Sequence, residues 1–238
     1  MLHSRHNSLR ALALVTGLLA LVVAPHAAEA LPVGDLWISE VMYNPGGFAA
    51  GDDDGYEWVE LFNAGSTDID LSNYSLGWGG DDYTTGTLPL SGTISPGDYF
   101  VVGGPNSDAS NGNPSYDLVL DFNPDLENGS LFRADGVALF DVTPVIPSSV
   151  PVHAIIYGGL LNLSGLIDET GAAGAVDFFF LAGGSSMEFD GAGWAAQGTP
   201  SPGSGGLVPA PEATPSLLMM LGLAGLAAKG TSRNRTTR

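Results

Sequence analysis

Short stretches of alternating apolar and polar residues, each bounded by turn-forming residues, recur between residues 36 and 198. A period of two places successive side chains on opposite faces of a β-strand, and no stretch sustains the 3.6-residue period of a helix. The chain also holds 34 Gly and 16 Pro, which suit many turns. We therefore expect an all-β, antiparallel sandwich with little helix. The predicted strands are 36–43, 56–62, 74–78, 99–102, 118–120, 137–140, 153–157 and 187–189.

The strand predicted at 56–62 carries the clearest alternation. Trp58 and Phe62 share one face and are expected to fill the core. The glutamates at positions 40 and 60 also lie in predicted strands. We expect Glu40 and Glu60 to pair with backbone donors or with the single arginine of this region.

Charge is distributed very unevenly along the chain. Residues 31–204 hold 24 of the 26 acidic residues and one basic residue, Arg133, so their formal net charge is 1 − 24 = −23. Such a surface repels phosphate backbones, which excludes nucleic acid as a partner. It attracts divalent cations and cationic partners, and it also favours solubility in an extracellular medium.

The N-terminal residues 1–30 have the layout of a secretory signal peptide. A basic start is followed by an apolar run at 11–23 and by small residues at Ala28 and Ala30. Signal peptidase is expected to cut after Ala30, which leaves 31–204 as the exported domain. The chain has no cysteine, so this domain must be stabilised by core packing or by bound metal.

The C-terminal part divides into a Pro/Gly/Ser-rich linker, 205–215, and a segment, 216–238, with an apolar run followed by basic residues. The N-terminal residues 1–30 and the C-terminal residues 205–238 are expected to be disordered or helical. The apolar run 217–228 would form a helix of about 18 Å, short of the ~30 Å hydrocarbon core. Its basic end is expected to stay on the cytoplasmic side of the membrane.

This segment resembles a PEP-CTERM tail, the sorting signal that exosortase transpeptidases recognise. Pro211 and Glu212 match the usual Pro-Glu-Pro core, whereas Ala213 replaces the second proline. The resemblance implies transient membrane association, cleavage by exosortase near Glu212, and transfer to the cell surface, outer membrane or extracellular matrix of a Gram-negative-type bacterium. A plain C-terminal anchor is the alternative.

The middle of the chain resembles a lamin-tail domain over about residues 36–203. The resemblance rests on 38–45, on the run Glu-Trp-Val-Glu-Leu-Phe-Asn at 57–63, on 69–76 and 94–102, and on an ending with Trp194 and a Thr-Pro-Ser-Pro-Gly turn at 199–203. It implies an immunoglobulin-like β-sandwich. Domains of this family generally serve as interaction or structural units.

Residues suited to catalysis are scarce in the domain. Its one histidine, His153, lies in an apolar strand and is expected to be a half-buried structural residue rather than a base. The absence of lysine from 31–204 excludes a P-loop, and neither a G-x-S-x-G nor an H-E-x-x-H motif occurs. We expect no enzymatic activity, with hydrolysis of a surface glycan through a carboxylate pair as the alternative.

Clustered aspartates in two turns suggest a calcium site. Asp52 and Asp54 precede one strand, and Asp81 and Asp82 follow another. Carboxylates on loops are the hard oxygen ligands that calcium prefers, although the spacing is not that of an EF-hand. Calcium is therefore a possible cofactor, and a solvated acidic loop is the alternative.

The sequence as a whole indicates a non-catalytic, exported surface or matrix protein. Its expected partners are exopolysaccharide or other surface proteins, in keeping with the PEP-CTERM and lamin-tail resemblances. A structural matrix protein bridged by calcium is a further alternative.

Overall fold

A computed structural model describes residues 32–47, 53–178 and 180–205. The predicted signal peptide, Asp52, the sorting residues Pro211 and Glu212, and the predicted C-terminal apolar helix lie outside these ranges. Within them the chain is all-β, and its one helical element is a 3-10 turn, Leu71–Asn73. None of the described helical segments is long and apolar enough to cross a membrane.

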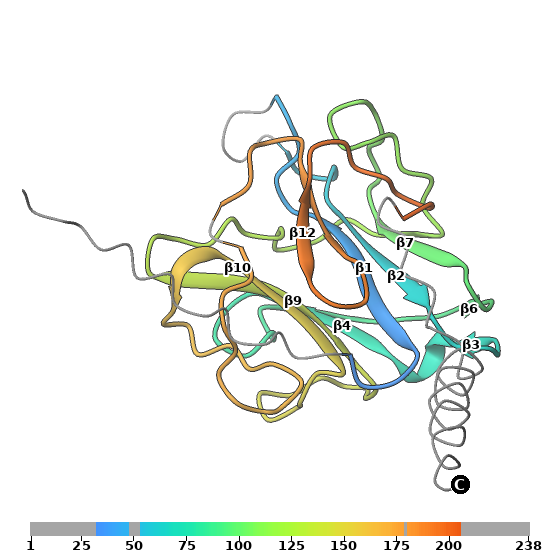
Figure 1. Ribbon diagram of the computed structural model, residues 1–238, viewed down its shortest axis with the longest axis horizontal. Coiled ribbons are helices and arrows are strands. Elements are labelled where there is room, and N and C mark those ends of the chain that lie inside the picture. The colour runs from blue at the N-terminus through green and yellow to red at the C-terminus, as the bar shows by residue number, and fades with distance from the viewer. Residues whose placement is uncertain (1–31, 48–52, 179, 206–238) are drawn as a thin grey trace, which may run out of the picture.

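Two main sheets pack face to face, with a small two-stranded sheet beside them (Figure 1). The strand order is β12-β11-β1-β2-β7-β8 in the larger sheet, β10-β9-β4-β5 in the second and β3-β6 in the third. All pairs are antiparallel except β7–β8, which is parallel. The strands are β1 (Leu36–Met42), β2 (Trp58–Asn63), β3 (Ile69–Asp70), β4 (Ser75–Trp78), β5 (Gly86–Pro89), β6 (Thr93–Ile94), β7 (Tyr99–Gly103), β8 (Leu118–Val119), β9 (Arg133–Phe140), β10 (His153–Asn162), β11 (Ser186–Phe189) and β12 (Trp194–Gln197).

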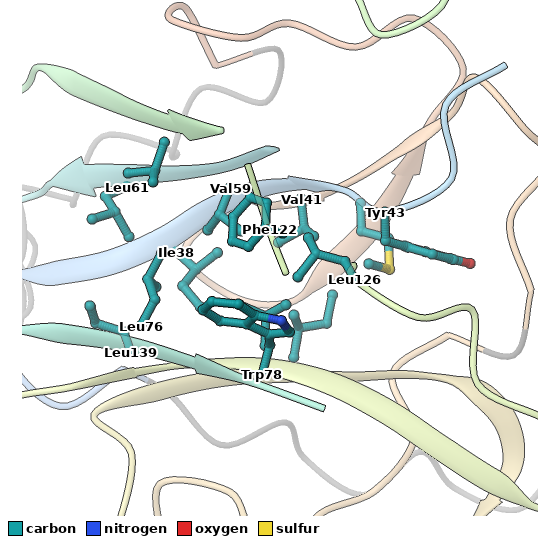
Figure 2. Close-up of a cluster of buried hydrophobic side chains, with 14 of the residues drawn as sticks. Ile38, Val41, Tyr43, Val59, Leu61, Leu76, Trp78, Phe122, Leu126 and Leu139 are labelled. Carbon is teal, nitrogen blue, oxygen red and sulfur yellow. The ribbon is translucent and has the colours of Figure 1, made fainter. Parts of the chain in front are cut away.

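The core forms where the inner faces of the two main sheets meet. Figure 2 shows side chains of β1 and β2, such as Val41 and Leu61, facing Leu76 and Leu139 of the other sheet. Phe122, from a loop, closes the space against Trp78, with ring centroids 5.0 Å apart. Burial of this apolar surface, at about 25 cal/mol per Å², is the main stabilising contribution in a chain without disulfides.

The alternating pattern of β2 was predicted correctly, but its core-facing side was not. Val59 and Leu61 face the main core, whereas Trp58 and Phe62 point to the opposite face of the larger sheet. Loops cover that face, so Trp58 is fully buried against Met42, while Phe62 is half-buried. When a sheet is covered on both faces, the side chains of both faces are buried. Alternation alone therefore cannot say which face of the strand points to the main core.

Strand lengths depart from the prediction where glycine interrupts the apolar pattern. β9 begins four residues before the predicted Val137, and β10 continues five residues past the predicted Tyr157, through Gly158 and Gly159. β3, β5, β6 and β12, of two to four residues each, were not predicted.

β10 is an edge strand whose outward backbone groups are paired by acidic side chains and by the backbone at 177–178, where the Asp177 amide donates to the Ile156 carbonyl and the Gly158 amide donates to the Phe178 carbonyl. The amide of Ala154 donates to the Glu169 carboxylate at 2.5 Å, and the amide of Ile156 donates to Asp177 at 2.8 Å. These carboxylates occupy the positions that a further strand would otherwise pair with.

Candidate functional site

A cavity lies at the end of the sandwich where β9 begins. Its volume is about 290 Å³. Two carboxylates, an arginine and two serine hydroxyls belong to its wall, so the wall offers both acceptors and donors. The lining residues are Gly80, Glu127, Gly129, Ser130, Arg133, Ala134, Asp135 and Ser164.

A tight turn before β9 shapes the rim of the cavity. Ser130 and Arg133 exchange backbone hydrogen bonds of 2.8 and 3.1 Å, which hold Leu131 and Phe132 at the tip. The preceding backbone lies directly on β10, because a Cβ added at Gly158 would come within 2.2 Å of the Asn128 carbonyl oxygen. Gly158 also has a φ of +79°, so both packing and conformation require glycine there.

Asp135 is the buried carboxyl of the cavity wall. β9 directs it to the same side as Val137 and Leu139, and the amide of Gly136 donates to it at 2.6 Å. Burial raises the pKa of Asp135 to about 7, and the nearby negative charge of Glu127 acts in the same direction. Near neutral pH this carboxyl can therefore either accept or donate a hydrogen bond.

A buried tyrosine pair lies behind Asp135. Tyr157 stacks on Tyr43 with ring centroids 4.2 Å apart, and its hydroxyl has no hydrogen-bond partner among the described residues. Burial raises the pKa of Tyr157 well above its ordinary value, and the charges of Asp135 and Glu57 add to this shift. The hydroxyl is thus neutral and lies close to the carboxylates of this end of the sandwich.

The structure separates the four aspartates of the predicted calcium site. Asp81 pairs with Arg133 at the rim of the cavity, and both side chains are more than half exposed. Asp82 accepts from the hydroxyl and amide of Thr84 within its own turn. Across the described ranges no group of three or more His, Asp or Glu side chains is placed to hold a metal ion, and Asp52 lies outside them.

Asp54 lies instead near two acidic residues that were not predicted to join it. Burial, followed by the charge of Asp54, raises the pKa values of Asp121 and Asp125. Nearby, Glu57 is almost fully buried and accepts from the Leu126 amide at 2.8 Å; burial raises its pKa to about 9. The fold thus holds the acidic side chains of these loops close together, although their like charges repel one another.

Three glutamates form a row across the larger sheet, with Glu40 opposite Glu60 on one side and Glu188 on the other. All three are buried. Glu40 accepts from the Ser201 amide at 3.1 Å, and Glu60 accepts from the Gly203 amide. The expected backbone partners of Glu40 and Glu60 are thus confirmed, whereas Arg133 pairs elsewhere.

His153 is fully buried rather than half-buried as predicted. Its Nδ1 accepts from the Ile38 amide at 3.0 Å, and its ring stacks on Trp194. Burial lowers the pKa of His153 to about 3, so the ring is neutral. A neutral ring enclosed by aromatic side chains joins two layers of the fold and has no access to a substrate.

Sequence reasoning missed the cavity residues. The only available signal was Asp135, a carboxyl that directly precedes the apolar strand predicted at 137–140. Glu127, Ser130 and Ser164 join it through the turns on either side of β9 and β10, which no local pattern reveals.

Comparison with known proteins identifies one family. The family described as Lamin Tail Domain matches residues 29–150, just over half of the chain. The match includes Glu127 and Asp135, whereas β10 to β12 follow it. No curated protein matches the chain.

Proposed function

Because the chain belongs to the lamin tail domain family, we propose that it is a non-catalytic interaction module, exported to the cell surface or extracellular matrix. The proposed ligand is a hydroxyl-rich polymer such as exopolysaccharide, or a second surface protein. The proposed ligand site is the cavity at the start of β9.

The observation that carries this proposal is the mixed hydrogen-bonding wall of the cavity. Asp135 and Glu127 supply acceptors, Arg133 supplies donors, and Ser130 supplies a hydroxyl. Sugar hydroxyls both donate and accept, so they match such a wall better than an apolar ligand does. The charge of −23 on residues 31–204 favours a neutral or cationic polymer over an anionic one.

Export and sorting complete the proposal. Signal peptidase would cut after Ala30, and exosortase would act near Pro211 and Glu212 after transient membrane association of 216–238. Support comes from the layout of the two terminal segments and from an acidic domain suited to an extracellular medium. A plain C-terminal anchor would place the same domain at the membrane surface.

Binding of the host's own exopolysaccharide to the exported chain tests the ligand. Asp135→Asn and Glu127→Gln each remove an acceptor charge, and we expect each to weaken binding at least about tenfold, measured by calorimetry. Asp190→Asn, in a turn between β11 and β12, is the matched control. Equal affinity of all variants would place the ligand elsewhere on the molecule.

A surface glycan hydrolase is the second candidate, and one observation favours it. Asp135, whose pKa burial raises to about 7, lies near the carboxylate of Glu127, and a pair of carboxyl groups supplies the acid and the base of glycosidases. Release of reducing ends from the same polymer distinguishes the two functions. Turnover that Asp135→Asn abolishes without unfolding the chain would favour the enzyme.

A further inference from the structure

The turn between residues 130 and 133 and the end of β10 together expose five large apolar side chains. Each is more than half exposed. The Leu160 amide donates to the Leu131 carbonyl at 2.9 Å, and the Leu163 amide donates to the Phe132 carbonyl at 3.2 Å, so they share one end of the molecule. This surface, here called the apolar knuckle, consists of Leu131, Phe132, Leu160, Leu161 and Leu163.

The apolar knuckle is large for a domain with so polar a surface. Five such side chains expose on the order of 500 Å², the size of the largest apolar patches on monomers, which are often functional. It also borders the acidic cavity, because Ser130 and Arg133 flank Leu131 and Phe132, and Ser164 follows Leu163. An occupant of this end therefore needs an apolar part and a cationic part.

A second copy of the domain does not meet this requirement. Each copy carries −23 over residues 31–204, and docking two knuckles would bring Glu127 and Asp81 of both copies together. The repulsion between like charges opposes that association.

The chain itself contains a segment with both parts. An apolar run at 217–228 is followed by Lys229, Arg233, Arg235 and Arg238, which are four of its seven basic residues. We propose that residues 217–238 dock on the apolar knuckle of the same chain, with the basic residues over the carboxylates of the adjoining cavity.

The linker must be nearly extended to make this contact. Gly205 lies against Tyr99, at the end of the sandwich where Phe62 pairs with Tyr99, while the apolar knuckle lies at the other end, beyond Tyr157. In Figure 1, β10 and β7 lie on opposite sides of the molecule. The ten residues of β10 extend about 33 Å, and the eleven residues 206–216 can span up to about 36–40 Å.

Docking would give the apolar run a cover outside the membrane. The inference rests on the geometry of the cavity and the knuckle and does not depend on which ligand the cavity binds.

Spin labels can report the docked state directly, because the chain has no native cysteine. Asn128→Cys, exposed between the cavity residues Glu127 and Gly129, and Ser232→Cys, among the basic residues, are labelled in the chain with its C-terminal segment intact. We expect a short, narrow distance population. The pair Leu131→Ser and Leu161→Ser is expected to lower the ratio of docked to undocked chains at least about tenfold.

The control pair Ile146→Ser and Val150→Ser removes two equally exposed apolar side chains outside the knuckle and should leave the distances unchanged. Thermal melting checks that each variant is folded. A parent chain without the short population, or a short population that survives the knuckle substitutions, overturns the proposal. Loss of the population on dilution with unlabelled chain also overturns it, in favour of contact between copies.

Discussion

At the scale of single residues, the protein keeps several carboxyl groups buried and protonated. Burial raises the pKa of Glu60 to about 8 and that of Glu57 to about 9. Asp135 and Glu169 reach about 7 for the same reason. An unfolded chain would release these protons near pH 4 to 4.5. The folded state therefore holds more protons than the unfolded state over a wide range of pH.

This difference predicts that stability falls as the pH rises. Below about pH 4.5 Glu60 makes its full contribution to the free energy of unfolding. That contribution is lost as the pH rises to about 8, by up to about 1.4 kcal/mol per pH unit. Denaturant unfolding from pH 5 to 9 measures the slope, and Glu60→Gln should flatten it below pH 8. Asp98→Asn removes an exposed carboxyl from a turn and serves as the control. Parallel curves for Glu60→Gln and the parent would contradict the prediction.

At the scale of elements, β1, β2 and β7 were predictable because they are rich in aromatic and β-branched residues and are bounded by turn-forming residues. The extra length of β9 and β10 was not, since Gly136 and Gly158 carry no side chain to mark a face. The cavity was also out of reach, because Glu127, Asp135 and Ser164 come together only through the pairing of β9 with β10.

The capped edge of β10 leads to a prediction about self-association. Glu169→Ala removes the acceptor of the Ala154 amide, and Asp177→Ala removes that of Ile156. We expect both changes together to increase aggregation at high concentration, because free edge amides can then pair with another chain. Light scattering over time measures this, with Asp190→Ala as the control for a lost charge.

At the scale of the whole molecule, repulsion among the ionised carboxylates of residues 31–204 opposes the compact state. Salt of any kind should therefore stabilise the fold by screening. A calcium site would add stability beyond screening, and the loops that carry Asp54, Asp121 and Asp125 are the place where the charges crowd.

Thermal melting in calcium chloride and in sodium chloride at equal ionic strength separates the two effects. Because no group of three or more described His, Asp or Glu side chains is placed to hold a metal ion, we expect the two melting curves to coincide. A higher melting temperature in calcium that a chelator removes and Asp54→Asn reduces would instead establish a calcium site at these loops. Light scattering against calcium concentration tests the calcium-bridged matrix.

The capped edge of β10 also limits how this protein can be packed in a crowded layer. Strand-by-strand growth needs an open edge, and at β10 that edge is occupied by the chain's own acidic side chains. Molecules displayed densely can thus come together through loops and faces without fusing into fibres through β10.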